Sequence, residues 1–245
     1  MSTTQQTKFA VFDIDGTLYR WQLFHELVQE LTFAGAFDET VFHEINDRWN
    51  KWRGGAMSFD EYESYIVTVL MAELPKLSVE LFDATCQKVV AQSRHKTYHY
   101  PRQLIADLKA QGYFLIALSG SQQELVDGFA AHYGFDVALG ALYERQESRF
   151  TGKVIRPILG RKEELLSEII VTHDLTTTGS IGVGDSEGDI SMLSLVESPT
   201  AFNPSSGLFE HAKASGWPII IERKNIAYRM EHQDNAFVLA ETIIY

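Results

Sequence analysis

Apolar and polar positions follow two different patterns along this chain. Residues 9–18 read FAVFDIDGTL, an apolar run typical of a buried strand that ends in polar residues. From there to about residue 100, apolar residues recur at helical spacing. This stretch predicts a bundle of about four helices, at 21–34, at 38–52, after the capping box Ser58–Glu61, and at 78–96.

From Arg102 onward, patterns typical of strands and of helices alternate. We expect helices at 102–111, 122–133 and 161–172, strands at 113–118, 180–184, 199–202 and 217–222, and a hairpin around 145–152. This alternation predicts an α/β fold, a three-layer Rossmann-like core around a parallel sheet. The core comprises residues 1–19 and 100–245, and an all-helical cap at 20–99 is inserted into it. Whether the tail 223–245 packs on the core or meets a partner chain is left open.

Composition narrows the class of protein. The chain has 245 residues, of which 45% are hydrophobic and 22% charged, as in an ordinary soluble globular protein. Its single cysteine, Cys86, cannot form an internal disulfide, which fits a reducing compartment. The N-terminus lacks an apolar signal core and no apolar run reaches membrane-spanning length, so we expect a cytoplasmic protein.

The net charge of −12 argues against nucleic acid and anionic membranes as partners. It also means that an anionic substrate needs a local positive site. The sequence leaves the oligomeric state open.

The first strand ends in two acidic residues, Asp13 and Asp15. Side chains at positions i and i+2 of a strand project to the same side, so we expect the two carboxylates to be neighbours. Two ionised carboxylates at that distance repel each other, and a divalent cation such as Mg²⁺ relieves the repulsion. Gly16 permits a backbone turn directly afterwards. Taken alone, the pattern also fits an ordinary acidic turn.

Two further strand ends carry polar groups, and ligands of open α/β sheets bind at this edge. Ser119–Gly120–Ser121 follows the second strand where we expect a helix to begin, and hydroxyl and N–H groups there can hold a phosphate. We interpret Ser121 as a cap of that helix and Ser119 as the phosphate ligand.

Asp185 and Asp189 follow the third strand on a glycine-flanked loop and suit Mg²⁺ coordination, with helix capping as the alternative. Lys162, at the start of a helix, could neutralise the carboxylates and bind a phosphate oxygen, although a solvated surface lysine is the simpler interpretation.

Taken together, these residues resemble the haloacid dehalogenase superfamily. The resemblance covers residues 8–18 and 100–222 and rests on four motifs in order, Asp13-x-Asp15-Gly-Thr-Leu, Ser119, Lys162 and Gly184-Asp185-x-x-x-Asp189. The helical insert looks like the C1-type cap of that superfamily. The sequence around Leu118–Gln122 and 140–152 looks most like the phosphoserine-phosphatase-like branch of the superfamily, subfamily IB.

The resemblance implies a phosphatase that acts on a small phosphorylated metabolite. Asp13 would be the nucleophile that forms an aspartyl-phosphate, and Asp15 would protonate the leaving alcohol and then activate water. Ser119, the backbone at Gly120 and Lys162 would hold the phosphoryl oxygens.

By the same resemblance, Mg²⁺ would be bound by the Asp13 carboxylate, the Asp15 backbone carbonyl and Asp185. Asp189 would contact these ligands without binding the metal itself. The alternatives are a non-catalytic module that senses a phosphorylated ligand, or a phosphotransferase that uses an acceptor other than water. The acid/base residue Asp15 argues against the sensor.

The chain departs from phosphoserine phosphatases where those bind their substrate. Gln22 replaces an acidic residue, Ile66 lies at or near the position of a carboxylate-binding arginine, and Gly188 replaces an asparagine. Arg53 is the alternative candidate for the role of that arginine. Placing a carboxylate beside isoleucine without a partner is unfavourable, so phosphoserine is disfavoured. Six aromatic residues of the cap are interpreted as bundle core, and the alternative is that one or two of them face the substrate: Trp21, Phe24, Trp49, Trp52, Phe59 and Tyr62.

Overall fold

A computed structural model describes residues 6–233 and 236–245 of the chain. These residues contain a nine-stranded sheet in the order β4-β3-β2-β1-β5-β6-β7-β8-β9. The central strands are parallel, whereas β4, β8 and β9 run antiparallel to their neighbours. The strands are β1 Thr7–Phe12, β2 Phe114–Gln122, β3 Val137–Gln146, β4 Arg149–Arg156, β5 Leu175–Gly184, β6 Ser198–Phe202, β7 Ile219–Arg223, β8 Ile226–Gln233 and β9 Ala236–Ile244.

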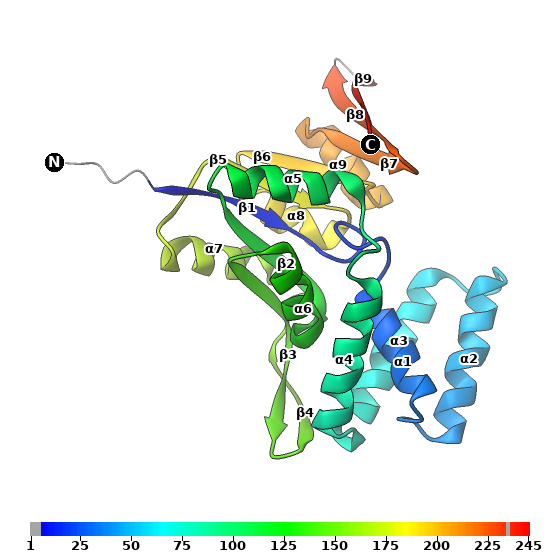
Figure 1. The fold of residues 1–245 in the computed structure, drawn as a ribbon. Helices are drawn as coiled ribbons and strands as arrows, with labels where there is room; N and C mark the ends of the chain where they lie inside the picture. The colour runs from blue at the N-terminus through cyan, green and yellow to red at the C-terminus, as the bar shows by residue number, and fades with distance from the viewer. Residues whose placement is uncertain (1–5, 234–235) are drawn as a thin grey trace.

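Helices cover both faces of the sheet, which makes three layers (Figure 1). Alternate residues of β1 point to opposite faces. Ala10 and Phe12 are buried on the side of α5 and α6, while Phe9 and Val11 are buried on the side of α7, α8 and α9. The bounds are α5 His99–Ala110, α6 Gln123–Tyr133, α7 Lys162–Thr172, α8 Ile190–Leu193 and α9 Ser206–Ser215. The α/β fold class is therefore confirmed.

The chain between β1 and α5 forms a bundle of helices. This bundle lies next to the carboxyl ends of the parallel strands (Figure 1). Ser58 and Glu61 form the expected capping box at its third helix. The two chain segments that enter and leave the bundle run side by side, since Arg20 N donates to Lys96 O and Tyr98 N donates to Leu18 O, both at 3.0 Å. The helices are α1 Leu23–Phe33, α2 Glu39–Arg53, α3 Phe59–Glu73 and α4 Val79–Ser93, with a 3₁₀ turn at Leu74–Lys76.

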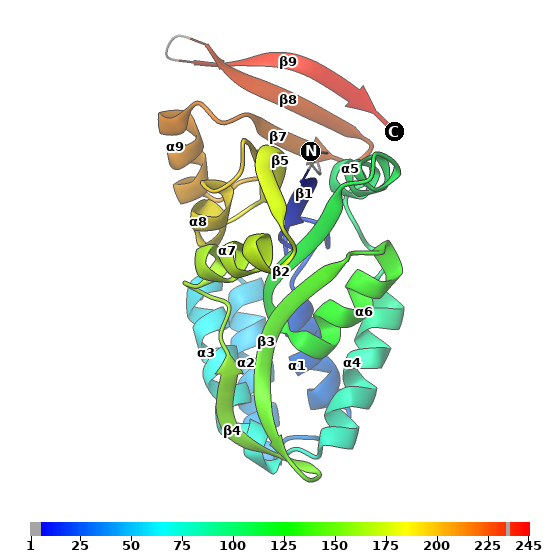
Figure 2. The same cartoon turned by 90° about the vertical axis from the view of Figure 1, so that its left-hand side faces the viewer.

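The β3–β4 hairpin extends beyond the sheet and lies along the start of α4 (Figure 2). Val79 N donates to Ser148 O at 2.9 Å, and the rings of Phe82 and Phe150 meet edge to face with centroids 4.9 Å apart. The fourth helix of the insert is therefore packed against the core. None of the helices in the described residues is both long and apolar enough to cross a membrane.

The structure corrects one expectation about the second strand. β2 continues to Gln122, and its pairing with β3 is interrupted between Leu118 and Gln122, so the serine segment lies within the strand. Helix α6 begins only at Gln123, and Gln122 is its N-cap, without a side-chain hydrogen bond. The interpretation of Ser121 as the helix cap was therefore wrong.

The C-terminal tail packs on the core. β8 pairs with β7 along Ile219–Arg223, and β9 pairs with β8 to form the sheet edge. The ring of Tyr245 stacks on His99 of α5 with centroids 5.0 Å apart. The tail thus extends the core sheet by two antiparallel strands.

Candidate active site

Acidic side chains gather where β1 and β5 end. The two strands are neighbours, with Phe12 opposite Val183, so the residues that follow them are brought to the same point of the sheet edge. Asp13 N donates to Val183 O at 3.0 Å, which fixes the turn after β1. Asp13, Asp185 and Asp189 each offer a carboxylate oxygen, and these oxygens lie within 4.8 Å of one another.

Lys162 is the positive charge of this cluster. It is the first residue of α7, and its Nζ donates to Oδ1 of Asp13 and to Oδ1 of Asp189, each at 2.6 Å. Burial alone would lower the pKa of the Lys162 ammonium, but the two carboxylates outweigh this effect and raise that pKa. The lysine is only 3% exposed, which excludes the interpretation as a solvated surface lysine.

The ammonium does not balance all of the negative charge. Burial raises the pKa of the Asp13 carboxyl well above its usual value, Lys162 works against that shift, and the other carboxylates add to it. Burial and the charge of Asp189 likewise raise the pKa of Asp185 to about 7. Without a further cation, the cluster is therefore electrostatically strained.

Asp15 is held separately from the other carboxylates. Its Oδ1 accepts from Leu23 N at the start of α1, and its Oδ2 accepts from Ser119 Oγ, both at 2.6 Å. Burial raises the pKa of the Asp15 carboxyl, and these hydrogen bonds partly offset the shift. The two aspartates of the first motif thus have different partners.

The family follows from a comparison of the sequence with known proteins. Residues 10–194 match the model of the haloacid dehalogenase-like hydrolase family. The chain belongs to this family.

Individual members are similar at low identity. The phosphoserine phosphatase of Archaeoglobus fulgidus is 26% identical over 213 residues, which are 86% of this chain but 57% of that protein. The histidinol-phosphatase of Neisseria meningitidis serogroup C is 24% identical over 224 residues, 86% of this chain and 97% of that protein. A structure described as a phospho-aspartyl intermediate analogue of phosphoserine phosphatase shares the fold, with a TM-score of 0.61, 21% identity, and coverage of 90% of this chain and 95% of that one.

Two residues that the sequence reasoning did not single out hold the metal-binding candidates of this hydrolase in place. Thr17 Oγ1 donates to Asp185 Oδ1 at 3.0 Å. Ser186 donates to Asp189 Oδ2 from its backbone N at 2.9 Å and from its hydroxyl at 3.0 Å. Each lies within two residues of a motif aspartate, a closeness that could have marked them as candidates.

The carboxylate cluster fits a divalent cation. Hard cations such as Mg²⁺ bind carboxylate and carbonyl oxygens, and the acidic side chains at this edge supply such oxygens in a nearly buried place. The raised pKa of Asp185 also fits a cation site, because it reflects excess negative charge that a bound cation would neutralise, which would favour the ionised carboxylate. Asp189 is the more deeply buried of the two loop aspartates, and three of its hydrogen bonds close the loop itself.

The serine segment of β2 supports the site differently from the sequence expectation. Because no helix begins there, Ser119 and Gly120 do not lie at a helix N-terminus. The Ser119 hydroxyl is fully buried, donates to Asp15 and accepts from Ser121 N at 3.0 Å. Gly120 is exposed, and an added Cβ there would lie 3.3 Å from the side chain of Leu159.

The residues at which the sequence departs from phosphoserine phosphatases lie in the helical insert and, for Gly188, in the loop after β5. Ile66 is fully buried in the bundle core. Gln22 is the N-cap of α1 and makes no side-chain cap bond, and Gly188 is an exposed residue of a 3₁₀ turn. Arg53 is exposed, with its guanidinium over the ring of Trp49 at 5.7 Å from the centroid.

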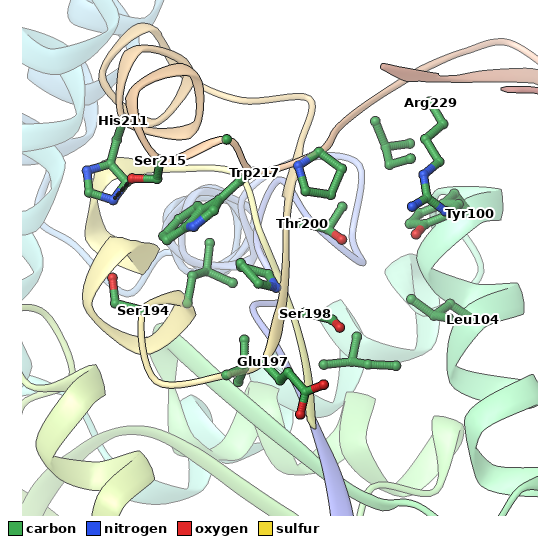
Figure 3. Close-up of a pocket in the computed structure, with 17 residues that line it drawn as sticks. Tyr100, Leu104, Ser194, Glu197, Ser198, Thr200, His211, Ser215, Trp217 and Arg229 are labelled. Carbon is green, nitrogen blue, oxygen red and sulfur yellow. Dashed lines mark hydrogen bonds between the residues drawn. The ribbon is translucent and has the colours of Figure 1, made fainter. Parts of the chain in front are cut away.

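Figure 3 shows a groove that none of these carboxylates lines. This groove has a volume of about 890 Å³ and is lined by α5, α8, β6, α9 and their loops. Its Arg229 pairs with Glu231 at 3.1 Å, and its His211 lies 3.3 Å from the Ser215 hydroxyl. Charged groups do not converge in it as they do around Lys162.

Proposed function

We propose that this protein is a Mg²⁺-dependent phosphomonoesterase that hydrolyses a small phosphorylated metabolite through an aspartyl-phosphate on Asp13. The observation that carries the proposal is the contact of one buried ammonium, Lys162, with both Asp13 and Asp189 at 2.6 Å. This arrangement provides a nucleophilic carboxylate next to a fixed positive charge, which is what phosphoryl transfer requires. The single cysteine fits a cytoplasmic enzyme.

In the first step an oxygen of Asp13 attacks phosphorus and the bond to the leaving alcohol breaks. Lys162 and the Gly120 N–H stabilise the phosphoryl oxygens. The Ser119 hydroxyl donates to Asp15 before the substrate binds and then donates to a phosphoryl oxygen instead. Mg²⁺, held by Asp13, the Asp15 carbonyl and Asp185, would supply further charge neutralisation.

Asp15 moves the protons. Its buried carboxyl has a raised pKa, so it can carry the proton that the leaving alcohol takes. In the second step Asp15 accepts a proton from water as the water oxygen attacks phosphorus, which releases phosphate and restores Asp13. The bond from Leu23 N holds this carboxyl in place throughout, and the bond from Ser119 does so before the substrate binds.

The helical segment 20–99 acts as a cap over this site, and residues 1–19 and 100–245 form the catalytic core. The substrate lacks a carboxylate of the phosphoserine type, because Ile66 is buried and Arg53 is exposed. The kinship to both a phosphoserine phosphatase and a histidinol-phosphatase supports a small alcohol phosphate.

The test is a broad panel of phosphate esters with purified protein and Mg²⁺. Turnover of at least one ester is expected, and Asp13→Asn should lower it by at least about a thousandfold while circular dichroism shows an intact fold. Asp107→Asn, at an exposed position of α5, is the matched control and should keep full activity. Retained turnover in Asp13→Asn would remove Asp13 as the nucleophile.

The two alternatives predict other results. A sensor binds phosphorylated ligands without turnover, whereas an enzyme with a reactive Asp13 is trapped by beryllium fluoride with Mg²⁺. A phosphotransferase produces a second phosphate ester instead of inorganic phosphate, so product analysis separates it from a hydrolase.

A further inference from the structure

Three partly exposed aromatic rings meet in the helical insert, and we call Trp21, Trp52 and Phe59 the aromatic cluster. The Trp21 ring stacks on Trp52, with centroids 5.5 Å apart and planes at 22°. Phe59 meets Trp21 edge to face at 5.9 Å and Trp52 at 5.7 Å. All three side chains retain solvent exposure, unlike Tyr62 behind them, which is 4% exposed.

The aromatic cluster lies beside Asp15. Gly16 N donates to Trp21 O at 3.1 Å, and Leu23 N donates to the Asp15 carboxylate, so Trp21 lies in the turn that surrounds this aspartate. Figure 1 shows that α1 begins, α2 ends and α3 begins at the end of the bundle nearest to the sheet. The aromatic cluster therefore lies at the end of the bundle nearest to Asp15.

A buried histidine in contact with the cluster has no hydrogen-bond partner among the described side chains. His25 is 4% exposed, and its ring stacks on Phe59 with centroids 5.4 Å apart and planes at 15°. Neither ring nitrogen makes a hydrogen bond with the described residues, and Nε2 lies 3.8 Å from Oε1 of Glu63. Buried polar atoms without partners are rare in folded proteins, so a ligand group that donates to His25 would account for it.

The charges around the aromatic cluster suit a cation. Among the described side chains, no lysine or arginine of α1–α4 is buried. Carboxylates lie close by, with Glu63 next to His25 and Glu26 in contact with the Tyr19 hydroxyl at 3.1 Å. The exposed guanidinium of Arg53 lies on the outer side, over the ring of Trp49 at 5.7 Å from the centroid. Faces of tryptophan and phenylalanine attract ammonium groups, whereas these rings themselves offer a carboxylate no hydrogen bond.

We propose that the aromatic cluster binds an ammonium group of the leaving alcohol, with His25 accepting one of its hydrogen bonds. The substrate class is then a phosphate monoester of an amino alcohol that carries no carboxylate. This inference rests on the proposed function and concerns the same site.

Four esters separate the possible contributions. 2-Aminoethyl phosphate and propyl phosphate have nearly the same size and differ by an ammonium in place of a methyl group. Phosphoserine adds a carboxylate to the first, and methyl phosphate reports phosphoryl transfer from an ester whose alcohol has no further substituent. We expect kcat/KM for 2-aminoethyl phosphate to exceed that for propyl phosphate and that for phosphoserine by about tenfold or more.

Matched variants assign the preference to the cluster. Phe59→Leu keeps an apolar side chain but removes the aromatic face, so the ratio of kcat/KM between 2-aminoethyl and propyl phosphate should fall at least about threefold. Phe33→Leu is the control, because Phe33 ends α1 at the other end of the bundle and is 65% exposed; it should leave the ratio unchanged. If Phe59→Leu does not fold, the same ratio measured for Trp52→Leu provides the test.

The outcomes distinguish this inference from the proposed function. Equal kcat/KM for 2-aminoethyl and propyl phosphate, a preference for phosphoserine, or an unchanged ratio in the variants would overturn the inference while turnover itself upholds the phosphatase. Turnover only of esters without an ammonium would likewise overturn the inference and uphold the phosphatase. If no ester of the broad panel is hydrolysed, the proposed function fails and the substrate class fails with it.

Discussion

Asp185 allows a test of the electrostatic strain in the carboxylate cluster. Burial and the charge of Asp189 raise the pKa of its carboxyl from 3.8 to about 7, against the opposing effect of the hydrogen bond from Thr17. In Asp185→Asn an uncharged amide takes the place of the repelled carboxylate. The amide oxygen can still accept from Thr17 Oγ1, which lies 3.0 Å from Oδ1. We predict that this substitution stabilises the protein when Mg²⁺ is absent.

The size of the gain depends on pH. A carboxyl with a raised pKa binds its proton more tightly in the folded state, so the folded state loses stability as the pH rises from the unfolded value to about 7. At 1.36 kcal/mol per pKa unit, the shift sets an upper limit of about 4 kcal/mol. Because the side chain is partly exposed, we expect a gain of about 1–2 kcal/mol above neutral pH.

Urea unfolding with a chelator measures the effect as a free energy of unfolding. The advantage of Asp185→Asn should be largest at about pH 8, smaller at about pH 5, and absent near the unfolded pKa. Excess Mg²⁺ should reverse the order, since the wild-type protein gains binding free energy that the variant, with one ligand fewer, does not gain in full.

The control is Asp107→Asn on α5, which should change the free energy of unfolding by less than about 0.5 kcal/mol at either pH, as expected for an exposed carboxylate. If Asp185→Asn proves less stable than the wild-type protein at about pH 8 without Mg²⁺, the carboxylate contributes as a hydrogen-bond acceptor and the argument from repulsion is refuted.

Two further substitutions probe the same cluster. Lys162→Met removes the charge that pairs with two buried carboxylates; turnover of the best panel ester should fall at least about a hundredfold, and urea unfolding without Mg²⁺ should show a loss of about 3 kcal/mol. Gly16→Ala places a Cβ 2.1 Å from Oδ2 of Asp185 at a φ of +81°, so the Mg²⁺-dependent rise in melting temperature should largely disappear, and an unchanged Mg²⁺ titration would contradict the predicted contact.

The parallel core could be predicted because its strands are buried on both faces. Phe114–Leu118 is an uninterrupted apolar run, and Ser180–Gly184 follows a similar pattern. Helix α9 was missed because only Leu208 and Ala212 of its ten residues are buried, too few to give a helical period. The role of β8 was left open because its residues are partly polar and do not themselves predict a buried strand. β8 joins the sheet because β7 offers a free edge with which it can pair.

The candidate site could be predicted where its residues immediately follow an apolar run. Asp13 and Asp185 do so, and the structure brings both together with Lys162. The end of β2 was misplaced for a physical reason. Residues that face a polar site are themselves polar, so the hydrophobic signal stopped at Leu118 although the strand continues to Gln122.

The position of the aromatic cluster is a consequence of helix direction. Helical spacing indicates which side of each helix is buried, but it does not indicate which end of the bundle faces the sheet. The chain enters the insert directly after Asp15, so Trp21 is fixed at the sheet end. Helix α1 leads away from that end and α2 returns to it (Figure 1), which brings Trp52 and Phe59, on either side of the α2–α3 turn, back to Trp21. Residues near this turn therefore lie at the end of the bundle nearest to Asp15, whereas Phe33, which ends α1, lies at the opposite end.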